Sequence, residues 1–248
     1  MSPAAKSRFA RRDRVGPGAA RDLAAGCPQA CYRQGMHVES FPVGPLGCNC
    51  SIVADLTARS AIVVDPGGDL EAIQARLAAR GLSVTAIVHT HTHIDHVGAT
   101  AGLQRSTGAA AKIHEADRFL YDLLPVQAAM IGCALPEKTE MEGSLLDGTT
   151  LRAGALEMGV LHTPGHTPGS VCFVVASGGE MRVFSGDTLF RRGIGRTDLW
   201  GGDAELIDRS LRGKLMTLAD DAIVVAGHGP STTIGEERRL NPFLARRA

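Results

Sequence analysis

The sequence predicts an α/β fold in which two β-sheets pack against each other with helices on the outside. Short runs rich in valine and isoleucine, separated by glycine, proline and polar residues, are typical of strands. These runs form two sets along the chain, and each set is followed by segments with the spacing of amphipathic helices. Two similar halves would therefore bury their sheets against each other, although no sequence repeat is visible.

The first half begins near residue 36 and combines strands with helices. One helix is expected after the sharp turn Asp65-Pro66-Gly67-Gly68, with Asp69 as its N-cap and Gly81 at its end. Another helix is expected from about residue 97 to about residue 106. Strands are expected at 37–43, 48–55, 60–65, 84–88 and about 111–114.

Residues 115–150 are less regular, and strands return after them. A helix around residues 119–124 is expected to stop at Pro125, and a second short helix is expected near 126–131. A helix at about 203–215 carries an apolar stripe that includes Ile207 and Leu211. Strands are expected at 151–152, 156–162, 171–176, 181–185 and 222–226.

The segment His91-Thr92-His93-Ile94-Asp95-His96 holds four metal-binding side chains directly after the predicted strand 84–88. Residues two apart in extended backbone point the same way, so His91 and His93 can bind one ion together. Asp95 and His96 fall on the following turn and suit a second ion. Imidazole and carboxylate groups are good zinc ligands and also suit iron and manganese. His89 is excluded, because a motif starting there would put His93 where the aspartate belongs.

Three further metal-binding residues lie at predicted strand ends. His166, Asp187 and His228 each follow a glycine, which permits unusual backbone angles and a close approach of the main chain to an ion. Each of them alone is weak evidence, because a histidine beside glycine is usually part of a turn. Their order along the chain after the first motif makes a shared metal site the stronger interpretation.

Bulk composition is that of an ordinary globular protein. The 248 residues are 44% hydrophobic with a formal net charge of zero, so a basic surface for nucleic acid is not expected. No apolar window approaches the roughly 20 residues of a membrane helix.

The six cysteines lack zinc-finger spacing, and we expect free thiols and a cytoplasmic location. Residues 1–35 are predicted to be a flexible, arginine-rich extension, with a targeting peptide or an over-early start codon as the alternatives. Residues 36–248 are predicted to form a single domain.

Taken in order, these ligands resemble the metal-binding series of the metallo-β-lactamase superfamily. The resemblance covers about residues 36–248 and implies a four-layer αββα sandwich that holds two zinc ions per chain, with iron or manganese as alternatives. It implies three roles: His91, His93 and His166 hold the first ion, Asp95, His96 and His228 hold the second, and Asp187 bridges the two.

The chain looks most like the short, single-domain glyoxalase II enzymes, the hydroxyacylglutathione hydrolases, within that superfamily. The stretches that carry this resemblance are Asn49-Cys50, 65–68, 193–198, 227–230 and 241–244. It implies hydrolysis of a small, glutathione-derived thioester such as S-lactoylglutathione by a metal-bridging hydroxide, with Asp95 and Asp187 as catalytic residues. Asp65 would accept a ring N–H from a ligand histidine, or else only hold its own turn. Arg196 and Asp198 would brace the loop after Asp187.

Other activities of the same fold stay open. A persulfide dioxygenase, with a single iron held by two histidines and an aspartate, shares the first motif and the Gly-x-Gly-Arg-Thr-Asp stretch. A β-lactamase is disfavoured because Asp187 stands where a cysteine is expected, and a non-catalytic metal-binding module is the remaining class.

Residues 115–150 are expected to overhang the metal site or to fill the core. His162 is expected beside the site and His114 on a loop.

Overall fold

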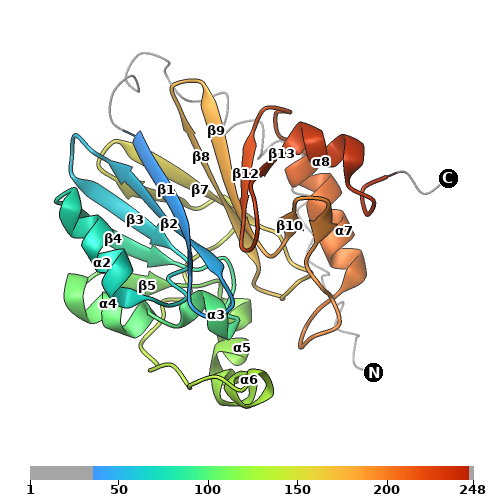
Figure 1. The fold of residues 1–248 in the computed structure, drawn as a ribbon. Helices are drawn as coiled ribbons and strands as arrows, with labels where there is room; N and C mark the ends of the chain where they lie inside the picture. The colour runs from blue at the N-terminus through green and yellow to red at the C-terminus, as the bar shows by residue number, and fades with distance from the viewer. Residues whose placement is uncertain (1–35, 246–248) are drawn as a thin grey trace, which may run out of the picture.

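Two β-sheets pack face to face, with helices against the outer face of each, in the computed structural model (Figure 1). The structure describes residues 36–245, so the predicted flexible extension at 1–35 lies outside the described residues. This arrangement is the four-layer αββα sandwich, and the fold prediction is confirmed. The single-domain organisation of residues 36–248 stays a prediction.

The first sheet has the order β1-β2-β3-β4-β5. Its strands are β1 (Met36–Val43), β2 (Cys48–Asp55), β3 (Ser60–Val64), β4 (Ser83–Val88) and β5 (Ala110–Lys112). The first three strands are antiparallel, whereas β3, β4 and β5 run parallel. Parallel neighbours need crossover connections. Helix α2 (Leu70–Ala79) supplies the first, and α3 (Ile94–Val97) with α4 (Thr100–Thr107) supplies the second.

The second sheet has the order β13-β12-β9-β8-β7-β6. Its strands are β6 (Thr150–Ala153), β7 (Leu156–His162), β8 (Val171–Ser177), β9 (Glu180–Gly186), β12 (Ile223–Ala226) and β13 (Thr232–Thr233). A small hairpin, β10 (Leu189–Phe190) with β11 (Gly193–Ile194), follows β9. Helices α7 (Ala204–Gly213) and α8 (Ile234–Leu240) and the 3-10 turn η2 (Leu215–Thr217) belong to this half.

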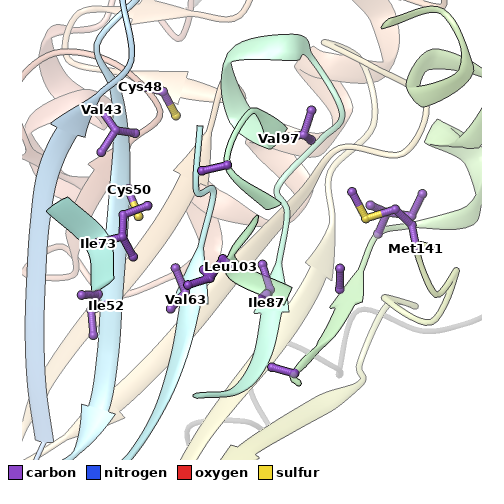
Figure 2. Packing of buried hydrophobic residues seen from close by; sticks show 14 of the residues in the cluster. Val43, Cys48, Cys50, Ile52, Val63, Ile73, Ile87, Val97, Leu103 and Met141 are labelled. Atoms are coloured by element: carbon purple, nitrogen blue, oxygen red, sulfur yellow. The ribbon is translucent and has the colours of Figure 1, made fainter. Parts of the chain in front are cut away.

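Strand alternation divides the core into three layers. Ile62 and Val64 of β3 face the other sheet, whereas Val63 between them faces the helices. In Figure 2, Val63 lies with Ile73 of α2 and Leu103 of α4 in the layer between the first sheet and its helices. A third cluster fills the space between the second sheet and α7 and α8. Each fully buried aliphatic side chain contributes about 1.5–3 kcal/mol, so the three layers together hold the sandwich.

One local prediction holds only in part, and another was wrong. Asp69 occupies the N-cap position of α2, but its side chain makes no cap hydrogen bond and instead accepts from Gly44 N at 2.9 Å. Pro125 does not stop a helix. It lies in the first turn of α6 (Leu124–Ile131), where its missing N–H costs nothing, directly after α5 (Arg118–Asp122).

Helix α8 and strand β13 were not predicted, because their few apolar residues show no clear period. The helix predicted from about residue 97 is α4, which begins at Thr100, and the short helix α3 before it was not predicted. Between them lies Gly98, where a Cβ atom would lie 2.3 Å from Gly67 O. No helix within residues 36–245 has the length and apolar character needed to cross a bilayer.

Candidate metal centre

The seven predicted ligands gather at one end of the two sheets. The segment His91–His96 follows β4 in the first sheet. His166, Asp187 and His228 follow β7, β9 and β12 in the second. These last three strands run parallel to one another, since β8 is antiparallel to both of its neighbours. Their carboxyl ends therefore meet at the same edge, where open α/β sheets bind ligands.

One group of ligand atoms comes from three histidines. His166 Nε2 lies 3.3 Å from His91 Nε2 and 3.0 Å from His93 Nδ1. All three side chains are buried. Burial first, and then the neighbouring rings, hold the pKa of His91 well below its usual value and lower that of His93 to about 3. Both rings are therefore neutral at physiological pH, with lone pairs free to bind a metal.

A second group comprises Asp95, His96 and His228. His228 Nε2 lies 3.0 Å from Asp95 Oδ2, and His96 Nε2 lies 3.8 Å from the same oxygen. Burial opposes ionisation of Asp95, but the neighbouring His96 and His228 hold the pKa of its carboxyl below its usual value. His228 is the most exposed of the three, with 30% of its side chain accessible, so this group faces solvent.

Asp187 lies between the two groups. Its Oδ2 is 3.7 Å from His166 Nε2, while its Oδ1 is 3.5 Å from His96 Nε2 and 3.9 Å from His228 Nε2. One carboxylate therefore presents one oxygen to each group. Gly227 makes this position possible, because a Cβ atom there would lie 2.2 Å from Asp187 Oδ1.

Three buried polar atoms in the cluster have no hydrogen-bond partner within residues 36–245. They are His93 Nε2, His96 Nε2 and Asp187 Oδ1. Buried polar atoms are almost always paired, because an unpaired one costs about 1–3 kcal/mol. Metal ions would satisfy Asp187 Oδ1 and His96 Nε2, and the histidine and carboxylate donors suit zinc, iron or manganese. The residues present thus fit a pair of metal ions.

In two of the buried histidines, His96 and His166, the ring nitrogen that faces away from the cluster has its own partner. His96 Nδ1 lies 3.0 Å from Asp65 Oδ2, which fits the expected role of Asp65 as an acceptor for a ligand histidine. Asp65 also accepts from Thr90 N and Oγ1, each at 2.7 Å. His166 Nδ1 donates to Arg196 O at 2.8 Å. These bonds leave each Nε2 to face the centre of the cluster.

Asp117 was missed by sequence reasoning. It lies in the 3-10 turn η1 (Glu115–Asp117) and is fully buried. Its carboxylate accepts hydrogen bonds from Thr92 N at 3.2 Å, Thr167 Oγ1 at 2.8 Å and Gly169 N at 2.5 Å. Thr92 adjoins both His91 and His93, and Thr167 adjoins His166. The Asp117 carboxylate therefore joins the two loops that supply the first group of histidines.

Two amide side chains tie down the remaining loops. Asn49 Nδ2 donates to Ala226 O and Gly229 O, each at 2.9 Å, on both sides of His228. Gln127 on α6 accepts from Ile94 N at 2.9 Å, at the start of α3. Residues 115–150 thus support the histidine motif through the hydrogen bond of Gln127 to Ile94 N. A lone amide in either segment carries no periodic signal, although Asn49 belongs to a stretch that resembles the glyoxalase II enzymes.

The remaining candidates lie outside the cluster. His89 is buried and bonded to Thr100 Oγ1 at 2.8 Å, as expected from its exclusion. His162 and His114 are half-buried and stack on each other, with ring centroids 4.0 Å apart. The Arg196 and Asp198 side chains pair with each other at 2.7 and 2.8 Å on the surface. Within the described residues, the cysteines Cys48, Cys50, Cys133 and Cys172 are free.

Comparison with known proteins gives one family. Residues 43–228 match the model of the metallo-beta-lactamase superfamily. A hydroxyacylglutathione hydrolase of Haemophilus influenzae, GloC, is 40% identical over 216 residues, covering 84% of this chain and 98% of that protein. The mitochondrial persulfide dioxygenase ETHE1 of Homo sapiens is 31% identical over 81% of this chain and 73% of that protein. The crystal structure of TTHA1623 in a di-iron-bound form superposes with a TM-score of 0.74, at 37% identity over 83% of this chain and all of that one.

Proposed function

The chain belongs to the metallo-beta-lactamase superfamily, and from that premise we propose that it is a dinuclear-metal hydrolase that cleaves a thioester such as S-lactoylglutathione. Such a substrate is a small molecule, and GloC, a relative of nearly equal length, is named for this reaction. The seven residues in the cluster would be the metal ligands. Zinc is the proposed metal, with iron or manganese as alternatives, and TTHA1623 is described in a di-iron form.

The position of Asp187 carries this proposal. A single ion needs only one group of ligands, whereas this carboxylate offers separate oxygens to His166 on one side and to His96 and His228 on the other. We propose that Asp187 bridges two ions. His91, His93 and His166 would hold the first, and Asp95, His96 and His228 the second.

Two metal ions bound here would lower the pKa of a water molecule toward neutrality and polarise the thioester carbonyl. The protein's own groups would hold and orient the reactants. Asp95 is partly exposed and lies beside His228 on the open side of the cluster, where its carboxylate can orient the nucleophile and accept its proton. Cys48 and Cys172 do not fit as nucleophiles, because burial raises the pKa of each thiol to about 11.

Metal analysis with a matched assay tests the proposal. Purified protein should contain two metal ions per chain and should hydrolyse S-lactoylglutathione, followed by the loss of thioester absorbance. Chelation should abolish hydrolysis, and added zinc, iron or manganese should restore it, with the best metal identifying the native one. Two bound metals without hydrolysis of any thioester would reject the substrate class.

The free thiols among the described residues support a reducing, cytoplasmic location, which we also propose.

A persulfide dioxygenase is the second candidate. The similarity to ETHE1 over most of this chain favours it, and a single iron would require only part of the ligand set. The same preparation distinguishes the two activities. Oxygen uptake with glutathione persulfide, together with one iron per chain, would establish the dioxygenase and reject the dinuclear hydrolase.

A further inference from the structure

A cavity of about 530 Å³ opens beside the metal cluster on the His228 side. Its walls come from two segments: Phe190, Arg191 and Arg192 at the tip of the β10–β11 hairpin, and His228, Gly229 and Pro230 after β12. The hairpin starts two residues after Asp187. The cavity is therefore lined by the most exposed proposed ligand of the second ion, and its other wall is the hairpin that follows the proposed bridging ligand along the chain.

The charge of this cavity favours an anion. The side chains of Arg191 and Arg192 are both about half exposed. They share one carboxylate, since Glu236 Oε1 lies 3.1 Å from Arg192 Nη2 and 3.7 Å from Arg191 Nε. Two guanidinium groups carry ten N–H donors in planar forks, and a single carboxylate occupies few of them. The remaining donors are free to bind a carboxylate group in the bidentate geometry that arginine favours.

The turn that presents these arginines is held in place by α8. Arg192 N donates to Glu237 Oε2 at 2.8 Å, and Glu237 is fully buried. Asn241 Nδ2 donates to the same oxygen at 2.9 Å and to Gly193 O at 3.0 Å. Both oxygens of Glu237 thus accept from neutral donors of the scaffold, Arg192 N and Asn241 Nδ2 on one and Thr232 Oγ1 on the other, and not from the arginine side chains. The hairpin tip is anchored rather than loose, which suits a preorganised binding site.

The backbone conformation at the tip of the hairpin also favours a binding site. Arg192 has a φ of 61°, in the left-handed region that favours glycine. This two-residue turn would form more easily with glycine at that position. Residues held in such uncommon backbone conformations cluster at ligand-binding sites, and this turn places the Arg192 side chain beside the cavity.

We infer that this cavity binds the carboxylates of an anionic thiol carrier, the glutathione half of the thioester, through Arg191 and Arg192. The inference rests on the proposed function and names its substrate class. A carrier bound there would place its sulfur end toward His228 and the metal cluster. Neutral thioesters would lack this interaction.

Direct binding tests the inference without hydrolysis. The probe is S-methylglutathione, which has both carboxylates but neither a thioester to cleave nor a free thiol to bind metal. Isothermal titration calorimetry with the metal-loaded protein should give a Kd that rises roughly threefold to tenfold for Arg191→Ala and for Arg192→Gly, and further for the double variant. Arg192→Gly suits the left-handed turn, so the fold should survive.

Two controls accompany the measurement. Arg152→Ala removes an exposed arginine on β6, at the opposite edge of the six-stranded sheet, and should leave the Kd unchanged. S-methylglutathione with both carboxylates esterified should bind the wild-type protein no better than it binds the double variant.

The outcomes separate the two proposals. No binding by the wild-type protein, equal Kd values for wild type and double variant, or full-strength binding of the diester would overturn the cavity assignment even if thioesters are hydrolysed. Arginine-dependent binding without hydrolysis of any thioester would retain the cavity as an anion site and reject the proposed reaction.

Discussion

Asp117 Oδ2 accepts a hydrogen bond from Thr167 Oγ1 at 2.8 Å, across 50 residues of sequence, and so connects the loop after β4 with the loop after β7. Because these loops supply His91, His93 and His166, the alignment of the first three histidines depends on a side chain that touches none of them.

Asp117→Asn should therefore weaken the first metal site selectively. An amide can replace only one acceptor oxygen, and its NH₂ group would face an N–H or O–H donor. Loss of such a supporting contact typically lowers metal affinity 10–100-fold. Metal titration should show one weakened and one near-normal ion per chain. Two ions bound with wild-type affinity would contradict a positioning role.

Stability should depend on pH through the same carboxyl. Burial raises the pKa of Asp117 to about 6 in spite of its hydrogen bonds, compared with about 3.9 in the unfolded chain. The folded state therefore binds this proton more tightly, and that stabilisation is present below pH 4 and lost as the pH rises to 6. In metal-free protein, the unfolding free energy of wild type relative to Asp117→Asn should fall by roughly 2–3 kcal/mol between pH 4 and pH 7. Chemical denaturation at several pH values measures this difference in unfolding free energy. A difference that stays constant between pH 4 and pH 7 would exclude the predicted pH dependence.

Asp187→Ala should remove the proposed bridge. Both groups lose a ligand, so we expect fewer than two ions per chain and a fall of more than about 100-fold in kcat/KM for S-lactoylglutathione. Metal content and kinetics should be measured on the same preparation. A variant with two ions and full activity would refute the bridging role.

Gly227→Ala should damage the cluster without changing any ligand. The added methyl group would lie 2.2 Å from Asp187 Oδ1 and 2.9 Å from His96 Cε1, so the carboxylate or the ring must move. We expect metal content and activity to fall at least about tenfold. Gly213→Ala is the matched control, because a Cβ atom there meets no atom within 4 Å. Equal effects of the two variants would argue against the steric explanation.

Asn49→Ala should loosen the loop that carries His228. It removes the side-chain bonds to Ala226 O and Gly229 O but keeps the backbone bond from Asn49 N to Gly227 O. We expect about tenfold weaker binding of the second ion and little change in the first. Stepwise metal titration distinguishes the two sites. Equal weakening of both would indicate a general loss of stability instead.

Local sequence patterns predicted much of the scaffold. The strands β2 and β7 have the predicted bounds, because short, largely apolar runs and the turn residues that flank them are local features of the sequence. The grouping of His91 with His93 could also be predicted, because their spacing places both on one side of an extended segment. The expected partnership of Asp65 with a histidine came from family resemblance and fits the contact with His96.

Other features had no local signal. The Asp69 carboxylate bonds to Gly44 rather than to its own helix, because the chain brings that turn of the first hairpin within reach. Asp117, Asn49 and Gln127 each look like ordinary polar residues, and their importance depends on backbone groups that only the folded chain places beside them. Arg191 and Arg192 at the hairpin tip likewise had no local signal, since only the folded chain places them beside His228.

The sequence by itself determined the family, the layered α/β architecture and the list of seven side chains able to bind metal, because these follow from periodicity and from short motifs. Only the tertiary structure decided how Asp187 divides its two oxygens between the histidine groups, which carboxylates hold the loops, and where a cavity with two arginines opens. Those relationships join residues far apart along the chain, and distances between such residues are set by packing of the two sheets rather than by any local pattern.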